Sequence, residues 1–460
     1  MNLTNINNSS FSAQALARVL AERLGLTPDT PLKIAFSGGL DSHVLLHALC
    51  ALRDPPCRGI TAVHIDHGLQ KNSAEWAQHC VQVCAGLGVS CLVERVEVLK
   101  IHEEGLEAAA RRARYARLAR HVGAGEVMLT AHHMDDQAET VLLQLLRGAG
   151  VHGLAAMPTM AEFSAGHLAR PLLEFTRHEL EAYANAHGLR WIEDTSNQDT
   201  RLARNFLRHR VFPLVGERWP GAARQLARSA RHAGEAAGLL DEMAATDILS
   251  CRVSSGTSLS VTALRRLSPP RRRNLIRYWL RAQGLQAPSA MHLDQIMVLT
   301  ENEPRSRHGL MRWPGTDVHR FRDELMAFPA RAPLDNALCL LWDPSMSLEI
   351  PGSGLRLRSE PVIGAGLSRA RIGHARLTVR LRQGGEICQL AGRRHHHKLK
   401  KLLQEAGIPP WERGRLPLVY ADDDLAAIGD RWVCEPYAAR TDEPSWKLVL
   451  ESAREFNRST

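Results

Sequence analysis

The sequence LKIAFSGGLDS, residues 32–42, joins a short apolar run to two adjacent glycines, an acidic residue and a serine. Leu32–Phe36 predicts a buried strand, and His43–Leu52 predicts a helix soon after the turn. Gly38 and Gly39 let the backbone turn tightly and bring its N–H groups close to an anion at the positive end of that helix. The stretch therefore predicts a strand, a phosphate-binding loop and a helix in succession.

The predicted nucleotide-binding loop consists of Ser37, Gly38, Gly39, Leu40, Asp41 and Ser42. The carboxylate of Asp41 would repel phosphate unless a cation lay between them, so we expect Asp41 to hold Mg²⁺. The loop lacks the G-x-x-x-x-G-K-[ST] pattern, which disfavours transfer of a γ-phosphoryl group. A tight turn with a serine N-cap is the alternative interpretation of Ser-Gly-Gly alone, but the longer pattern after an apolar strand is more specific.

Strand-like and helix-like stretches alternate as far as about residue 195. Strands are expected at 32–36, 60–65, 89–96 and 127–130, and helices at 43–52, 74–87, 106–122, 135–146 and 176–187. This alternation predicts βαβ units and a mostly parallel sheet that binds ligands beyond the carboxyl ends of its strands. The predicted fold class is α/β, with a parallel-sheet nucleotide-binding domain at 1–218, a helix-rich middle domain at 219–330 and a small α+β C-terminal domain at 345–450.

Composition narrows the class of protein. With 44% hydrophobic and 23% charged residues the chain is not disordered, and no apolar run approaches the roughly 18 residues of a membrane-spanning helix. Nine irregularly spaced cysteines without C-x-x-C disfavour a zinc knuckle, an iron–sulfur site and a disulfide framework. We expect reduced thiols in a cytoplasmic protein without a secretory signal. The net charge of +9 alone leaves a polyanionic partner open.

The segment VHIDHGL, residues 63–69, ends the second predicted strand, where a parallel sheet places its nucleotide contacts. We therefore assign His64 to nucleotide binding. A metal site made of His64, Asp66 and His67 is disfavoured because neighbours along a strand point to opposite faces. Local hydrogen bonding is the other alternative.

The segment EAAARRARY, residues 107–115, predicts an alanine-rich helix. Arg111 and Arg114 share one face of it, while Arg112 points about 100° away. Arg111 and Arg114 are candidates for contact with phosphate groups. A solvated basic face is the alternative.

Acidic and basic side chains recur beyond the fourth predicted strand. Asp136, Glu139 and Thr140 lie about one helical turn apart, so they can converge on a metal or a substrate ammonium. Capping of the helix dipole is the alternative role of such carboxylates. Arg204 and Arg208 are candidates for phosphate contacts, and salt bridges within a buried loop are the alternative for them.

A basic strip lies near the C-terminus at residues 393–401, RRHHHKLKK. Its candidates for phosphate contact are Arg393, Lys398, Lys400 and Lys401. A metal bound by His395–His397 is the weaker alternative, because lysines and arginines flank the histidines.

Together these segments resemble the tRNA(Ile)-lysidine synthase family of the PP-loop (ATP-pyrophosphatase) superfamily. The strings with the family's order and spacing are SGGLDS, VHIDHGL, EAAARRARY, AHHMDDQAET, RPLL, WIEDTSNQD and RNFLR. The segments KLKKLL (398–403) and IPPWER (408–413) are similar to its last domain. The chain departs from the family's Gly-His-His at Ala131, a residue that is also small.

The resemblance implies a PP-loop ATPase domain and a ligase that forms a carbon–nitrogen bond. ATP and Mg²⁺ would adenylylate the wobble cytidine of the CAU anticodon of tRNA(Ile), and L-lysine would then displace AMP. It implies catalytic roles for Asp41, Arg111 and Asp136, and lysine binding by Asp136 and Glu139, with the individual roles of these two acids left open. It also implies a cytoplasmic homodimer.

By the same resemblance the residues expected to bind tRNA are Arg204, Arg208, Arg393, Lys398, Lys400 and Lys401. A PP-loop tRNA thiolase is the alternative function. It is disfavoured because such enzymes often use C-x-x-C cysteines, which this chain lacks.

Overall fold

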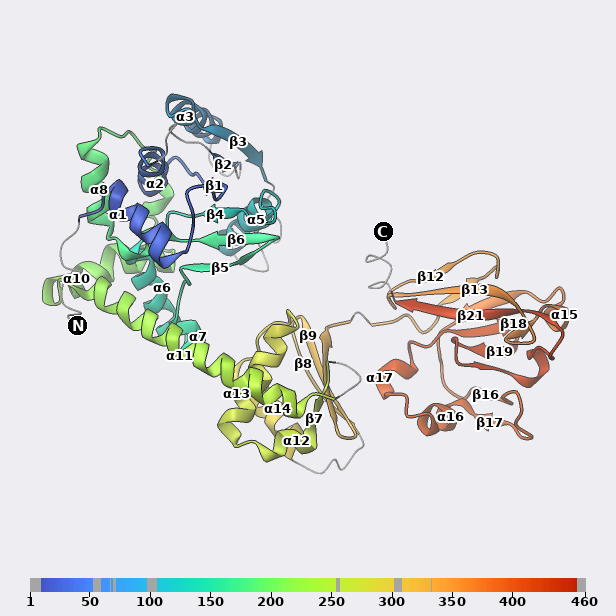
Figure 1. The fold of residues 1–460 in the computed structure, drawn as a ribbon. Helices are drawn as coiled ribbons and strands as arrows, with labels where there is room; N and C mark the ends of the chain where they lie inside the picture. Colours follow the sequence, from blue (N-terminus) through green and yellow to red (C-terminus); the bar gives the residue numbers. More distant parts are fainter. Residues whose placement is uncertain are drawn as a thin grey trace. The chain divides into compact units, whose positions relative to one another are not determined.

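The computed structural model describes residues 10–52, 59–66, 68, 72–96, 106–253, 257–301, 308–331 and 333–452. The chain divides into two compact units, one up to Leu240 and one from Asp241 onward (Figure 1). No helix in the described part of the chain is long and apolar enough to cross a membrane.

The first unit is built on a six-stranded sheet in the order β3-β2-β1-β4-β6-β5. All neighbours pair in parallel except β5 and β6, which form an antiparallel edge hairpin. The strands are β1 (Leu32–Ala35), β2 (Ile60–Asp66), β3 (Ser90–Arg95), β4 (Val127–Leu129), β5 (Met160–Phe163) and β6 (Gly166–Ala169). The four predicted parallel strands are confirmed, and the edge hairpin was not predicted.

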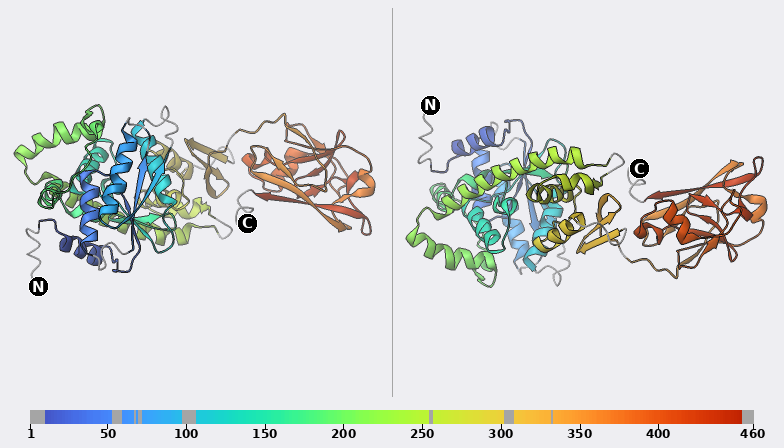
Figure 2. Two further views of the ribbon diagram at one scale, coloured as in Figure 1. Left: turned by 90° about the horizontal axis from the view of Figure 1, so that it is seen from above. Right: turned by 90° about the horizontal axis from the view of Figure 1, so that it is seen from below.

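Helices cover both faces of this sheet, as Figure 2 shows from two further directions. The α-helices in the described residues up to Cys251 are α1 (Ala13–Arg18), α2 (Leu40–Cys50), α3 (Ser73–Gly86), α5 (Leu106–Ala119), α6 (Met134–Leu146), α7 (Val151–Leu154), α8 (Arg177–Ala186), α9 (Ala203–Phe206), α10 (Phe212–Arg218) and α11 (Ala222–Cys251). The last of these crosses the boundary between the two units.

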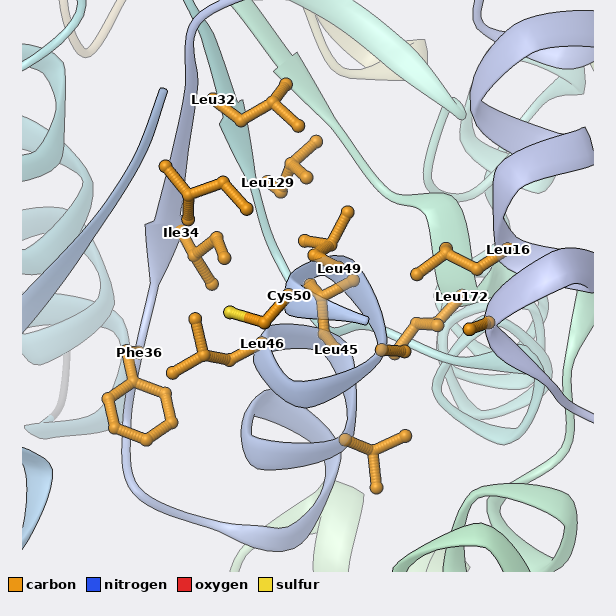
Figure 3. Close-up of a cluster of buried hydrophobic side chains, with 14 of the residues drawn as sticks. Leu16, Leu32, Ile34, Phe36, Leu45, Leu46, Leu49, Cys50, Leu129 and Leu172 are labelled. Carbon is orange, nitrogen blue, oxygen red and sulfur yellow. The ribbon is translucent and has the colours of Figure 1, made fainter. Parts of the chain in front are cut away.

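Successive side chains along β1 and β2 point to opposite faces of the sheet, and each face packs into a hydrophobic core of its own. Leu32, Ile34 and Phe36 are buried against α2 on one face (Figure 3), while Val63 of β2 packs with Leu118 of α5 on the other. A sheet covered on both faces leaves only its strand ends open to a ligand. The site is therefore expected at the carboxyl ends of β1, β2 and β4.

After α11 the second unit contains the helices α12 (Val261–Arg266), α13 (Pro269–Ala282) and α14 (Ala290–Glu301), in keeping with the predicted helix-rich domain. They pack on an antiparallel sheet of order β7-β10-β9-β8, which was not predicted. Its strands are β7 (Leu259–Ser260), β8 (His308–Trp313), β9 (Thr316–Phe321) and β10 (Glu324–Pro329). Buried polar side chains in β9 interrupt the alternation of apolar residues by which a strand is predicted from sequence. Asp317, for example, accepts from Arg312 Nε at 2.7 Å.

The C-terminal part of this unit carries two larger antiparallel sheets, β11-β15-β18-β19-β20 and β12-β13-β21-β14. Their strands are β11 (Cys339–Leu341), β12 (Leu348–Ile350), β13 (Leu355–Ile363), β14 (Leu367–Ser368), β15 (Leu377–Arg380), β18 (Leu418–Ala421), β19 (Asp424–Ile428), β20 (Trp432–Val433) and β21 (Pro444–Ser452). A small hairpin of β16 (Ile387–Cys388) and β17 (His397–Lys398) adjoins the helices α15 (Arg369–Ile372), α16 (Leu399–Glu405) and α17 (Pro410–Arg413). This agrees with the predicted α+β class.

One cysteine departs from the expectation of reduced thiols. Cys50, at the end of α2, is disulfide-bonded. A single bridge at a helix end needs no regular cysteine spacing, so the sequence pattern carried no signal of it. The free cysteines of the described chain are Cys80, Cys84, Cys91, Cys251, Cys339, Cys388 and Cys434.

Candidate active site

The predicted phosphate loop lies between β1 and α2, and its shape depends on one glycine. Gly38 has φ = +80°, a conformation that favours glycine. A Cβ at this position would lie 2.8 Å from Cys80 Sγ and 3.0 Å from Ile192 Cδ1. Both constraints require glycine at position 38, so α3 can pack directly against the loop.

Hydroxyl groups hold the rest of the loop. Ser42 Oγ donates to the carbonyl oxygen of Gly39 at 3.0 Å and lies 3.0 Å from Ser37 Oγ. Gly39 is the N-cap of α2, so free backbone N–H groups of the first helical turn face the loop. This is an arrangement that binds phosphate.

A cavity of about 620 Å³ opens beside the loop, at the carboxyl edge of the sheet. Predicted residues that line it are Ser37, Gly39, Asp41, Ser42, His64 and Arg114, and Asp194 and Asn197 of the WIEDTSNQD segment line it as well. Gly38, Leu40 and Arg111 are not among its lining residues. The volume is in the range of small-molecule sites.

His64 lies buried in the wall of this cavity. Its Nδ1 is 2.9 Å from the carbonyl oxygen of Phe36. Because a carbonyl oxygen can only accept, Nδ1 carries the proton and Nε2 is left as an acceptor in the neutral ring. The interaction also ties the end of β2 to the start of the phosphate loop.

The metal alternative for the end of β2 gains no support. Asp66 accepts from the Gly68 N–H at 2.8 Å and pairs with Arg95 at 3.4 Å. Burial opposes ionisation of Asp66, but these hydrogen bonds lower its pKa below the usual value. The third member of that alternative, His67, lies outside the described residues. No group of three metal-ligating side chains occurs in the described part of the chain.

Asp41 combines a buried oxygen with cationic neighbours. Its Oδ2 lies 3.7 Å from His133 Nε2 and 3.8 Å from Arg177 Nη1. Its Oδ1 is buried without a hydrogen-bond partner, and burial raises the pKa of this carboxyl. An unsatisfied carboxylate oxygen beside a phosphate loop suits Mg²⁺, which takes one or two carboxylates and completes its shell with phosphate oxygens and water.

His133 links the loop to the acidic helix α6, and sequence reasoning did not single it out. Its Nε2 lies 3.7 Å from Asp41 and 3.4 Å from Asp136, and its Nδ1 lies 3.5 Å from Asp135. Burial alone would lower the pKa of His133, but these three carboxylates raise it above the usual value. The pair of histidines before two aspartates was a visible signal, whereas nothing in the sequence placed Arg177 near Asp41.

The structure brings the predicted lysine-binding acids together with two predicted tRNA-binding arginines. Arg208 Nε donates to Glu139 Oε1 at 2.7 Å, and Arg208 Nη2 donates to Asp136 Oδ1 at 2.9 Å. Arg204 lies 3.8 Å from Glu139 and donates to Thr140 Oγ1 at 3.0 Å. The salt bridges considered as the alternative from sequence are therefore present. We call these five residues the acid–arginine cluster.

Both acids of the cluster are buried, but their pKa values shift in opposite directions. Burial raises the pKa of Glu139 although Arg208 opposes the change. Burial would also raise the pKa of Asp136, but His133, His132 and Arg208 lower it below the usual value. Asp136 is thus held as an anion, while Glu139 binds a proton more readily.

Arg111 and Arg114 do not play equal parts. Arg114 lines the cavity together with Tyr115. The guanidinium of Arg111 instead lies 4.9 Å from the Tyr115 ring centroid, and its Nη2 is 3.4 Å from the tyrosine hydroxyl. Arg111 therefore supports a wall of the cavity.

The basic strip of the C-terminal part lies on the surface of the second unit. Arg393 and Lys401 approach Glu405 at 3.6 Å and 3.9 Å. Lys398 ends β17, and Lys400 lies on α16. These exposed side chains suit phosphate contacts.

Comparison with known proteins adds three family models and several full-length relatives. The models are a PP-loop domain at residues 9–215, a TilS substrate binding domain at 259–326 and a TilS substrate C-terminal domain at 377–450. The tRNA(Ile)-lysidine synthase of Alkalilimnicola ehrlichii is 45% identical over 96% of this chain and 97% of its own length. The chain belongs to the tRNA(Ile)-lysidine synthase family.

Two further tRNA(Ile)-lysidine synthases extend the similarity. The enzyme of Methylococcus capsulatus is 42% identical over 90% of this chain and 95% of its own length. The enzyme of Coxiella burnetii is 39% identical over 93% of this chain and 94% of its own length. Membership of the lysidine synthase family confirms the resemblance inferred from the motifs and sets aside the thiolase alternative.

Proposed function

We propose that the chain is an ATP-dependent tRNA(Ile)-lysidine synthase that joins L-lysine to the wobble cytidine of a CAU anticodon. One observation carries the proposal. The phosphate-loop carboxylate of Asp41 and the acid–arginine cluster meet at the same buried imidazole, His133, beside a nucleotide-sized cavity. A loop that holds pyrophosphate and a cluster that holds an amino acid are thus within a few ångströms of each other.

The proposed reaction has two steps. The O2 atom of the cytosine attacks the α-phosphorus of ATP, and pyrophosphate leaves while the loop N–H groups and the Ser37 and Ser42 hydroxyls hold its oxygens. The amine of lysine then attacks C2 of the base, AMP leaves, and the amine loses a proton. Mg²⁺ bound at Asp41 would neutralise charge on the phosphates.

The acid–arginine cluster offers groups for both the positive and the negative charge on free lysine. Asp136, held as an anion, suits the ammonium, while Arg204 and Arg208 suit the carboxylate. Glu139 is 2% exposed and already bonded to Arg208, so lysine binding must rearrange that pair. Contact of Arg204 or Arg208 with tRNA phosphates would require the same rearrangement.

The remaining assignments belong to the same proposal. Arg111 acts through Tyr115, and Arg114 faces the triphosphate. The basic residues Arg393, Lys398, Lys400 and Lys401 contact tRNA. The enzyme acts in the cytoplasm, as a homodimer and with Mg²⁺.

The test is direct. Purified protein, ATP, Mg²⁺ and isotopically labelled lysine are incubated with tRNA that bears a CAU anticodon, and the wobble nucleoside is analysed by mass spectrometry. We expect cytidine to gain lysine with loss of water. Incorporation of sulfur, or no lysine in that tRNA, would contradict the proposal.

A further inference from the structure

The position of the target base follows from the proposed function, on which this inference rests. The cytosine O2 must reach the α-phosphorus, so the base has to lie against the phosphates and therefore beside the phosphate loop. Enzymes that act on a nucleobase take it out of its stack and hold it between aromatic or apolar side chains. An aromatic side chain near the loop with a free ring face would provide such a stacking surface.

Most aromatic rings at the cavity are already engaged. Phe36 is 1% exposed, with its ring in the core (Figure 3). The His64 ring is buried and bonded to the Phe36 carbonyl. The guanidinium of Arg111 covers Tyr115, and His132 Nδ1 lies 2.8 Å from Thr130 Oγ1.

Trp76 differs from these four. It lines the same cavity from α3 and is half-buried. Among the described residues none stacks on its ring, places a cation over it or accepts a hydrogen bond from its indole N–H. A partly exposed tryptophan with an unoccupied face in an enzyme cavity is a platform for a planar ligand.

The position of Trp76 along α3 places it beside the phosphates. Cys80 and His79, which lie 2.8 Å and 3.7 Å from a Cβ built at Gly38, follow Trp76 by four and three residues. At this spacing the three side chains share one helix face. Trp76 is one turn nearer the N-terminus of α3 and hence beyond the carboxyl edge of the sheet, next to the loop.

The adenine ring of ATP has a different place available. Val63 and Ile65 of β2 and Leu118 of α5 line the same cavity but belong to the core on the opposite face of the sheet from α2 and α3. An apolar slot of this kind suits a purine. We propose that adenine occupies the α5 side and that Trp76 stacks on the target cytosine of the tRNA.

Replacement of Trp76 by Leu and by Phe tests the proposal. Leu keeps apolar volume without a π face, whereas Phe keeps a smaller one. Because stacking of one base on an aromatic side chain corresponds to about tenfold to a hundredfold in affinity, we expect Trp76→Leu to lower kcat/KM for tRNA by that factor. Trp76→Phe should recover much of the loss, and the Kd of ATP measured without tRNA should change less than about twofold in both variants.

Three results would overturn the inference. Wild-type kcat/KM for tRNA in Trp76→Leu would show that the ring is not used. A weakened Kd for ATP in that variant would place the adenine on Trp76 instead. Equal losses in the Phe and Leu variants would indicate a packing role. If the wild-type protein itself fails to modify tRNA, the proposed function falls, and this inference falls with it.

Discussion

The phosphate loop and the acid–arginine cluster approach His133 Nε2 at 3.7 Å and 3.4 Å, through Asp41 and Asp136, but they are built in different ways. The loop is one continuous stretch of six residues, and its shape depends on a glycine conformation and two serine hydroxyls. The cluster joins α6 to residues 64 to 72 positions further along the chain. The loop is thus specified locally, whereas the cluster exists only after the first unit has folded.

The largest expected effect is at the loop. Asp41→Ala should abolish pyrophosphate release, because the phosphates lose the group that holds their cation. A loss of at least about a hundredfold is the scale for removal of one electrostatic contact to a reacting group. The measurement is pyrophosphate release with saturating tRNA.

Asp41→Asn is the matched control for that variant. It keeps the size of the side chain without its charge and should be as inactive as Asp41→Ala, while both variants bind tRNA like wild type. Loss of tRNA binding with normal release would contradict the assigned role.

Removal of an arginine from the cluster should affect stability as well as activity. Arg208→Ala leaves Glu139 buried without its bidentate partner, and breaking a buried ion pair costs about 3–5 kcal/mol in free energy of unfolding. Urea unfolding measures this change. Arg201→Ala is the control, since Arg201 pairs with Asp199 on the surface and is 90% exposed. Similar unfolding midpoints for the two variants would show that the cluster is not a structural element.

The conformation of the loop predicts that alanine substitutions at the neighbouring Gly38 and Gly39 differ in their effect on stability, by a smaller amount than the effects above. Gly38→Ala forces an alanine to φ = +80° and against Cys80 Sγ, which should cost about 1–3 kcal/mol. Gly39→Ala should be nearly neutral for folding, because its φ is −78° and its nearest contact would be 3.5 Å from Ser37 Oγ. Thermal unfolding of both variants tests the difference. Adding Cys80→Ala to Gly38→Ala should remove the clash with the sulfur atom but not the backbone strain at φ = +80°, so only part of the lost stability should return.

The last predicted effect concerns pH. Burial lowers the pKa of His132 to about 3, so the folded protein resists a proton that the unfolded chain accepts near pH 6.5. Stability should therefore fall as pH drops from 6.5 toward 3. The raised pKa of His133 acts in the other direction, since its contribution is complete below pH 6.5 and is lost as pH rises through that raised value.

Melting temperatures across the acid and neutral range, without nucleotide or Mg²⁺, separate the two histidines. His132→Asn should flatten the acid side of the profile, and His133→Asn should flatten the neutral side. Identical slopes in the variants and the wild type would contradict both assignments.

The difference between a loop specified locally and a cluster formed by distant residues also explains which features could be predicted from the sequence. The strands and helices around the loop were predictable because their periodicity and their glycines are local. Pairing of Arg204 and Arg208 with Glu139 was open from sequence, because arginines at that spacing suit phosphate and carboxylate equally well. Trp76 carried no sequence signal, since a tryptophan on an amphipathic helix is usually a core residue.

Two local patterns were also missed for physical reasons. Strand β9 carries several buried polar residues, such as Asp317, which pairs with Arg312, and these interrupt the apolar alternation that predicts a strand. Arg111 and Arg114 were expected to act together, but only Arg114 lines the cavity, while the guanidinium of Arg111 lies over the Tyr115 ring. Tertiary contacts therefore decide which residue of a repeated type reaches a ligand.

Contact between Cys80 and the phosphate loop makes that thiol an internal reporter. Cys80 is fully buried, and burial raises its pKa to about 12, so it is almost wholly protonated and shielded from alkylating reagents at neutral pH. Alkylation at Cys80 can proceed only when α3 and the loop separate transiently. The rate of labelling, followed by peptide mass spectrometry, would then measure how often the nucleotide site opens, and bound ATP should slow it.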